Sequence, residues 1–227
     1  MDTTVTTAEQ LEKMKRDWDE RARENARYYV ATGNEQWTDA EFFASGERAV
    51  AEDILTDMTN VCQGRDPKQM RVLEIGCGAA RVTRALANLF GEVHAVDVSG
   101  EMVAHARAAL KEHPNARIYQ NNGMDLEAVP SDQPFDFAYS GIVFQHIPSY
   151  EVIENYVKEV HRMLRPGALF KFQVQGHVTL ASSPGDTWHG VAFSKERADA
   201  MARRCGFELR YDFGEGNQYF WLWFFKK

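Results

Sequence analysis

Apolar residues follow two different rhythms along the chain, and the change falls at about Met70. Before that point they recur at steps of three and four, which places them on one face of a helix. The first series is Leu11, Met14, Trp18, Ala22, Ala26 and Tyr29. Beyond Met70, short apolar runs alternate with helical patterns. The change predicts one domain with two parts, a helical N-terminal cap over residues 1–68 and an alternating β/α core over residues 69–227.

Two capping signals mark the helices of the N-terminal part. A Thr followed three residues later by Gln or Glu can form a capping box, in which each side chain bonds the other residue's backbone N–H. Thr7 with Gln10 and Thr38 with Glu41 fit this pattern. We expect a first helix from Thr7 and a second that carries apolar residues as far as Met58.

Seven short apolar runs in the second part predict strands. They lie at residues 72–75, 93–96, 117–120, 135–139, 169–174, 207–213 and 219–225. Strands that alternate with helices form right-handed crossovers, so we expect a seven-stranded, mostly parallel sheet with helices on both faces. The last two runs are joined by a short Gly-rich turn, which predicts an antiparallel C-terminal hairpin. The continuous aromatic run at 219–225 predicts a strand buried on both faces.

Composition narrows the class of protein. The 227 residues are 44% hydrophobic and 26% charged, as in ordinary globular chains. The net charge of −7 argues against nucleic acid or an anionic membrane as the main partner. The three cysteines lack a paired spacing, the N-terminus is polar, and no apolar run is long enough for a membrane helix, which predicts a cytoplasmic protein. Scattered histidines without Cys-x-x-Cys predict no metal site, while the choice between monomer and homodimer stays open.

The main chemical signal is a glycine turn between the first core strand and the following helix. Gly76 permits a tight turn, and Gly78 lets a ligand approach the backbone. Asp97 ends the next strand, where a carboxylate can accept hydrogen bonds from ribose hydroxyls. These features predict nucleoside binding. The third glycine of the dinucleotide fingerprint is replaced by Arg81, which disfavours a nicotinamide cofactor without excluding it.

Beyond these residues, the chain resembles the class I S-adenosylmethionine-dependent methyltransferases. The matching segments are VLEIGCGAARVTRALA, VHAVDVSGEMVAHAR, NNGMDLEAVP, FDFAYSGIVFQHIP and VHRMLRPGALFKFQV, in the family's order and spacing. The resemblance implies S-adenosylmethionine as cofactor and S-adenosylhomocysteine as product. It also implies a seven-stranded sheet with a terminal antiparallel hairpin and a helical cap over the cofactor.

The resemblance also implies roles for residues at the strand ends. Glu74 and the turn Gly76, Cys77 and Gly78 would hold the methionyl end of the cofactor, and Asp97 would hold its ribose. The adenine would contact Val98, Met102 and the loop Asn122, Gly123, Met124 and Asp125. Many family members have Asp directly after the loop glycine; here that position is Met124, so either Asp125 or the loop backbone and Asn122 would replace it. Ser140 and Gly141 would line the cavity around the methyl donor.

Three further side chains are candidates near the reaction centre. His146 follows the fourth core strand, where it could orient or deprotonate the acceptor, or simply support its loop by backbone hydrogen bonds. Arg21, in the first helix, could reach the methionyl carboxylate. Trp188 lies at the end of the polar loop after the fifth core strand and is a candidate acceptor contact.

The expected function is therefore transfer of a methyl group from S-adenosylmethionine to a small-molecule acceptor by in-line displacement. Holding donor and acceptor in line contributes most of the catalysis in such a reaction, so strong acid–base groups are optional. Two alternatives remain, a nicotinamide-dependent oxidoreductase and a non-catalytic cofactor-binding module of the same fold.

Overall fold

A computed structural model, which describes residues 6–177 and 187–227, places seven strands in one sheet of order β3-β2-β1-β4-β5-β7-β6. The strands are β1 (Arg71–Ile75), β2 (Glu92–Asp97), β3 (Ala116–Gln120), β4 (Phe135–Ser140), β5 (Leu164–Gln175), β6 (Phe207–Phe213) and β7 (Tyr219–Lys226). The first five pair in parallel, and β7 runs antiparallel to both β5 and β6. The predicted mostly parallel sheet and terminal antiparallel pair are confirmed.

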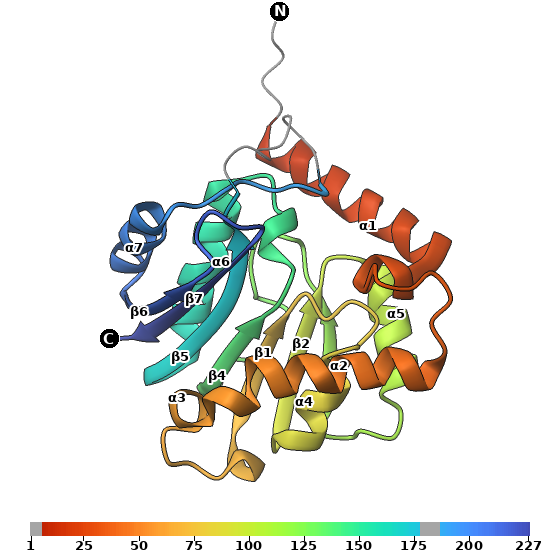
Figure 1. The fold of residues 1–227 in the computed structure, drawn as a ribbon, viewed down its shortest axis with the longest axis horizontal. Helices are drawn as coiled ribbons and strands as arrows, with labels where there is room; N and C mark the ends of the chain where they lie inside the picture. Colours follow the sequence, from red (N-terminus) through yellow and green to blue (C-terminus); the bar gives the residue numbers. More distant parts are fainter. Residues whose placement is uncertain (1–5, 178–186) are drawn as a thin grey trace, which may run out of the picture.

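Helices cover both faces of this sheet (Figure 1). They are α1 (Thr7–Val30), α2 (Asp39–Asp53), α3 (Met58–Cys62), α4 (Thr83–Leu89), α5 (Gly100–Ala109), α6 (Tyr150–Met163) and α7 (Lys195–Arg204). Apolar side chains of α6 and α7 pack on one face, chiefly against β5 and β7. Side chains from α2, α3 and α4 pack on the other face, and α5 covers β2 and β3 there. Burial of both faces explains why the central strands are continuous apolar runs.

The N-terminal helices do not act as one cap. Helix α1 runs across the carboxyl edge of the strands, whereas α2 and α3 belong to the layer on the sheet face (Figure 1). The capping box of α1 is formed by Thr6 and Glu9, one residue before the predicted pair. The second predicted helix is broken at Ile54, so that α2 ends at Asp53 and α3 starts at Met58. Ile54, the residue at the break, is completely buried.

Two strands differ from their predicted form. Strand β5 begins at Leu164, before the Pro-Gly pair predicted to precede it, because Leu164 already pairs with Phe135 of β4. Strand β7 is not buried on both faces: Phe220 is fully buried, but Trp221 is only half-buried. The reason is that α2 and α3 cover the outer face of β7 incompletely. Within the described parts of the chain, no helix is long and apolar enough to cross a membrane.

Candidate cofactor site

The turns that follow β1 and β2 are locked together by backbone hydrogen bonds. Gly76 and Gly78 have φ of 77° and 50°, left-handed values that favour glycine. The N–H groups of Gly76 and Cys77 donate to the Val96 carbonyl at 2.8 and 3.0 Å. The Asp97 carboxylate accepts from Gly78 N at 2.8 Å and from Ser99 N at 2.9 Å. The two carboxyl ends of the strands are thus fixed at one edge of the sheet.

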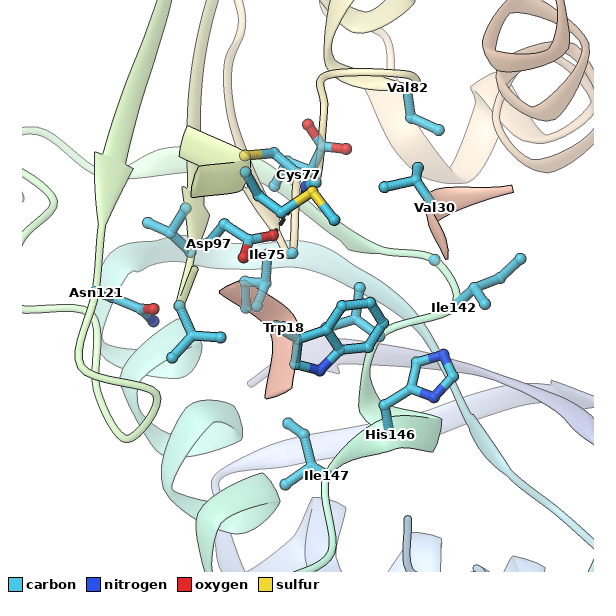
Figure 2. A pocket seen from close by; sticks show the side chains of 18 of the residues that line it. Trp18, Val30, Ile75, Cys77, Val82, Asp97, Asn121, Ile142, His146 and Ile147 are labelled. Carbon is cyan, nitrogen blue, oxygen red and sulfur yellow. Dashed lines mark hydrogen bonds between the residues drawn. The ribbon is translucent and has the colours of Figure 1, made fainter. Parts of the chain in front are cut away.

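A cavity of about 100 Å³ lies above these turns. Figure 2 shows Asn121 at one end, Val30 and Ile142 at the other, and Asp97 between them. The site residues predicted from the sequence that line this cavity are Glu74, Gly76, Cys77, Gly78, Asp97, Val98, Met102, Gly141 and His146. The structure thus brings the glycine turn, the acidic strand end and the region after β4 to one cavity.

Three residues that line the cavity each have a buried side-chain polar atom without a hydrogen-bond partner among the described residues. These atoms are Glu74 Oε2, Arg81 Nε and Asn121 Oδ1. Such groups lose their hydration on burial, and native structures normally satisfy them. Their clustering around one cavity indicates a ligand that offers two hydrogen-bond donors and one acceptor.

The side-chain amide of Asn121 is oriented by hydrogen bonds from its nitrogen, which leave the amide oxygen without a partner in the described part of the chain. Its Nδ2 donates to Tyr156 Oη at 2.7 Å and to the Asp125 carbonyl at 3.1 Å. A carbonyl can only accept, so the amide nitrogen must face Asp125. The amide oxygen, Oδ1, is therefore the atom without a partner. From the sequence, the contact to adenine was predicted in the loop from Asn122 to Asp125. Asn121, which lies just before this loop, was not named.

Arg81 is the second cavity-lining residue that the sequence analysis did not name as a site residue. Its Nη1 donates to the Ser45 carbonyl of α2 at 3.1 Å, which holds the side chain over the cavity. Helix α2 comes this close because Gly46 has no side chain: a Cβ there would lie 1.8 Å from the Arg81 carbonyl oxygen. No sequence pattern signals this contact, since it depends on how α2 packs against the turn.

Burial makes both acids of the cavity harder to ionise. It raises the pKa of Glu74 to about 7, although the nearby Thr83 hydroxyl and the Arg81 charge oppose the shift. It raises the pKa of Asp97 to about 6, against the two backbone N–H bonds that favour the carboxylate. A cationic group beside Glu74 would restore its charge.

Helix α1 closes the cavity from above and is tied to α5 by side chains. Its Met14, Trp18 and Val30 line the cavity. The Asp19 carboxylate accepts from Ser99 Oγ at 2.6 Å and from Glu101 N at 3.2 Å. In contrast to the strand-end turns, these contacts all depend on side chains of α1.

Arg21 lies outside the cavity. Its Nη2 donates to Thr187 Oγ1 at 3.1 Å, and its guanidinium lies over the rings of Trp18 and Trp188, 4.7 and 5.3 Å from their centroids. Thr187 Oγ1 in turn donates to Asp17 at 2.7 Å. Arg21 therefore ties α1 to the segment at Thr187. The polar loop before this segment falls largely at 178–186, outside the described residues.

His146 lines the cavity with both ring nitrogens close to hydrogen-bonding groups. Nδ1 lies 2.6 Å from the Trp188 carbonyl, so it carries the proton. Nε2 lies 3.2 Å from Gln145 Nε2 and accepts from that amide. The ring also packs edge-on against Trp18. This geometry favours the supporting role that the sequence left open over that of a general base.

The remaining predicted contacts lie just outside the cavity. Asn122 Oδ1 accepts from the backbone N–H of Met124 at 2.8 Å and of Asp125 at 3.0 Å, so the loop holds itself. Met14 lines the cavity and packs against this loop, since a Cβ on Gly123 would lie 3.1 Å from Met14 Cε. The Met14 side chain therefore lies between the loop and the cavity. Ser140 donates to the Ile75 carbonyl at 2.9 Å and is fully buried. Their roles toward a cofactor stay predictions.

The sheet order, the antiparallel last strand and the glycine turn beside an acidic strand end define a class I S-adenosylmethionine-dependent methyltransferase fold. Residues 72–167 match the family model described as a methyltransferase domain. Residues 72–167 therefore carry a methyltransferase domain, as predicted, and the comparisons support the predicted cofactor, S-adenosylmethionine.

Known proteins resemble the chain over part of its length. It is 34% identical to a malonyl-[acyl-carrier protein] O-methyltransferase of Enterobacter lignolyticus over 103 residues, 45% of this chain and 38% of that protein. It is 31% identical to a demethylmenaquinone methyltransferase of Staphylococcus carnosus over 105 residues, 45% of this chain and 42% of that protein. The chain thus spans less than half the length of these relatives.

A solved structure shares the fold over nearly the whole chain. Magnesium protoporphyrin IX methyltransferase from Synechocystis, with bound S-adenosylhomocysteine, matches with a TM-score of 0.67 and 15% identity. The match covers 94% of this chain and 98% of that chain. At this identity the likeness shows the architecture, including the helical N-terminal part.

Proposed function

We propose that this protein transfers a methyl group from S-adenosylmethionine to a small-molecule acceptor by in-line displacement. The net charge of −7 gives no electrostatic attraction for nucleic acids. The demethylmenaquinone relative acts, by its name, on a small molecule. The observation that carries the proposal is the set of three buried, unpartnered polar atoms around the cavity.

Those atoms match the hydrogen-bonding groups of the cofactor. Glu74 Oε2 would accept from the methionyl ammonium, and Arg81 Nε would donate to the methionyl carboxylate. Asn121 Oδ1 would accept from the adenine amino group. Asp97 lies between Asn121 and the glycine turn, where its carboxylate would accept from the ribose hydroxyls (Figure 2). Arg81 thereby takes the role predicted for Arg21.

The bound cofactor supplies an electrophilic methyl group on a sulfonium, so the protein mainly aligns its partners. Alignment of this kind can lower the barrier by roughly 7–11 kcal/mol. Glu74 and Arg81 would fix one end of the donor and Asn121 the other. His146 would position the loop after β4 through its bond to the Trp188 carbonyl.

Entry of the cofactor requires α1 to give way. Pockets for ligands of drug size usually span about 300–1,000 Å³, whereas this cavity encloses about 100 Å³. Met14 and Val30 of α1 occupy part of the space over the glycine turn and the loop at Gly123. The described arrangement is a closed form, and α1 would move outward before the cofactor binds.

A thermal melt with S-adenosylhomocysteine, and with NADH as the control ligand, tests the cofactor site first. A ligand at about 100 times its Kd stabilises by about 2.7 kcal/mol, which raises Tm by roughly 5–10 °C at this size. Incubation with methyl-labelled S-adenosylmethionine and pooled small-molecule extracts then tests transfer.

Each outcome has a distinct meaning. A shift with S-adenosylhomocysteine followed by labelled product supports the proposal. A shift with NADH alone would overturn it in favour of the oxidoreductase. Binding of S-adenosylhomocysteine without transfer to any acceptor would identify a non-catalytic module.

A further inference from the structure

A second cavity of about 340 Å³ lies between α2 and the start of β7. We call it the α2–β7 groove. Its walls include Arg48, Glu52 and Asp53 of α2 and Tyr219 and Trp221 of β7. Tyr219 pairs with Gln175 near the carboxyl end of β5, so the groove opens at the edge of the sheet that carries the cofactor site. Ligands of open α/β sheets bind at this edge.

The groove and the cofactor cavity share a wall. Arg81, Tyr139, Gly141 and Ile142 line both. Ile142 is a β-branched residue with a φ of 58°, a conformation that costs energy and is concentrated at functional sites. Its side chain is 38% exposed, although it is apolar. Two compartments that meet at a strained apolar residue suit a reaction between a donor and an acceptor.

Aromatic rings form the side walls of the groove. Trp221 and Tyr139 are stacked, with centroids 6.1 Å apart and planes 26° from parallel. Tyr219 is 46% exposed at the mouth. Flat ring systems stack on such surfaces, and an aromatic pair stabilises binding beyond the effect of its buried area. The walls therefore favour a flat aromatic occupant.

One carboxylate oxygen is available at the inner end. Tyr139 Oη donates to Asp53 Oδ2 at 2.8 Å and is buried against Gly141 in the shared wall. No hydrogen bond in the described part of the chain uses Asp53 Oδ1, and Asp53 is only partly buried. Arg48 and Glu52 carry opposite charges at the outer rim, so the inner end is distinguished by an acceptor of hydrogen bonds.

We propose that the α2–β7 groove holds the methyl acceptor, and that this acceptor is a flat aromatic molecule with a hydroxyl group. The ring lies between Trp221 and Tyr219, and the hydroxyl donates to Asp53 Oδ1. The proton that the hydroxyl loses on methylation passes to the same oxygen. Burial raises the pKa of Asp53, which brings it closer to that of a proton acceptor useful near neutral pH. The inference rests on the proposed methyltransferase function.

Three matched probes separate ring shape from hydrogen bonding. 2-Naphthol is flat and carries a hydroxyl, 2-methoxynaphthalene is flat without the donor, and decahydro-2-naphthol keeps the hydroxyl without the flat ring. Their Kd values are measured by ligand-observed NMR with and without saturating S-adenosylhomocysteine. We expect 2-naphthol to bind at least tenfold more tightly than either analogue.

Variants place the binding in this groove. Tyr219→Ala should weaken 2-naphthol about tenfold, while Tyr211→Ala should not, because Tyr211 is 52% exposed, against 46% for Tyr219, but does not line the groove. Asp53→Asn should reduce the preference for 2-naphthol over 2-methoxynaphthalene. Since Tyr219 is exposed, its variant stays informative even if Asp53→Asn is unstable.

The outcomes distinguish this inference from the proposed function. If S-adenosylhomocysteine binds but no probe does, or if Tyr219→Ala leaves 2-naphthol binding unchanged, the groove is not the acceptor site. Equal affinity for the flat and saturated alcohols would overturn the aromatic class. If the probes bind as expected but S-adenosylhomocysteine does not bind, the methyltransferase function fails and the groove is only a ring-binding site.

Discussion

The strand-end turns and helix α1 enclose the same cavity but are held in different ways. The turns after β1 and β2 are fixed by bonds that involve backbone N–H groups, such as Gly78 N to Asp97 and Gly76 N to the Val96 carbonyl. The hydrogen bonds that tie helix α1 to α5 all use side chains of α1, as in the bonds that Asp19 accepts from Ser99 Oγ and Glu101 N. Backbone bonds within a sheet open only with the sheet, whereas side-chain ties can break one at a time.

This difference assigns a rigid half and a movable half to the cofactor site. The rigid half presents Glu74, Asp97 and Asn121 at fixed positions on strand ends. The movable half contributes Met14, Trp18 and Val30, which fill the closed cavity. Preformed polar contacts reduce the ordering cost of binding, and a cover that moves lets a large ligand enter. Four changes test the contrast.

Gly76→Ala should cause the largest loss of stability, because Gly76 lies in the rigid half of the site. A Cβ at φ 77° would lie 2.2 Å from Val143 Cγ2. The left-handed conformation and the overlap together should lower the free energy of unfolding by about 3 kcal/mol. Urea unfolding measures the loss, and titration with S-adenosylhomocysteine should show loss of binding.

Gly33→Ala is the matched control for this change. A Cβ there meets no atom within 4 Å, so stability should change little. If the two variants are equally stable, the turn is not the rigid element described above.

Raising the pH should destabilise the ligand-free protein through Glu74. Its pKa is about 7 in the folded chain against an ordinary value of 4.5. The folded state therefore binds more protons between these values, and the contribution of Glu74 to stability is present below pH 4.5 and lost as pH rises through 7. The loss should be on the order of 3 kcal/mol.

Two histidines act in the opposite direction, because desolvation lowers the pKa of the buried His94 and of the partly buried His161. The difference between the wild type and Glu74→Gln isolates the carboxyl group. The free energy of unfolding of both proteins is measured from pH 4.5 to 8. The variant should gain stability relative to the wild type as the pH rises. If the difference in unfolding free energy between the two proteins stays constant across this pH range, the pKa of Glu74 is not raised by folding.

Arg81→Gln should weaken S-adenosylhomocysteine by about tenfold or more, because a charge-assisted hydrogen bond is worth about 1.5–3 kcal/mol. Arg84→Gln provides a matched control: Arg84 is also half-buried with Nε unpartnered in the described chain, but it does not line the cavity. Calorimetric titration of both variants measures the difference. Equal affinities would remove Arg81 from the cofactor site.

Sequence alone predicted the parts of the molecule that depend on local pattern. Strand β6 has the predicted bounds, and the glycine turn and Asp97 meet as expected because adjacent parallel strands end at one edge. Arg81 and Asn121 were not predicted to line the cavity, since their positions and unpartnered atoms are set only once α2 and α6 pack around them.

Arg21 shows the complementary limit. Helical periodicity correctly put Trp18 on the inner face of α1, but it does not fix how a helix is rotated over its neighbours. In the fold, Arg21 meets Thr187, 166 residues further on. A contact of such long range has no counterpart in local sequence.

Asp19→Ala should have the smallest effect on stability and the clearest effect on motion. Removing the carboxylate that accepts from Ser99 and Glu101 should cost about 1 kcal/mol. Amide hydrogens of α1 should then exchange faster, while those of β1 and β2 keep their protection. S-adenosylhomocysteine should also associate faster, because the closed form that excludes it is less populated. Glu20→Ala, an exposed carboxylate on the same helix, is the control and should change neither rate. Uniform acceleration of exchange in α1, β1 and β2 would mean that the helix and the strand ends open together, and the division into rigid and movable halves would not hold.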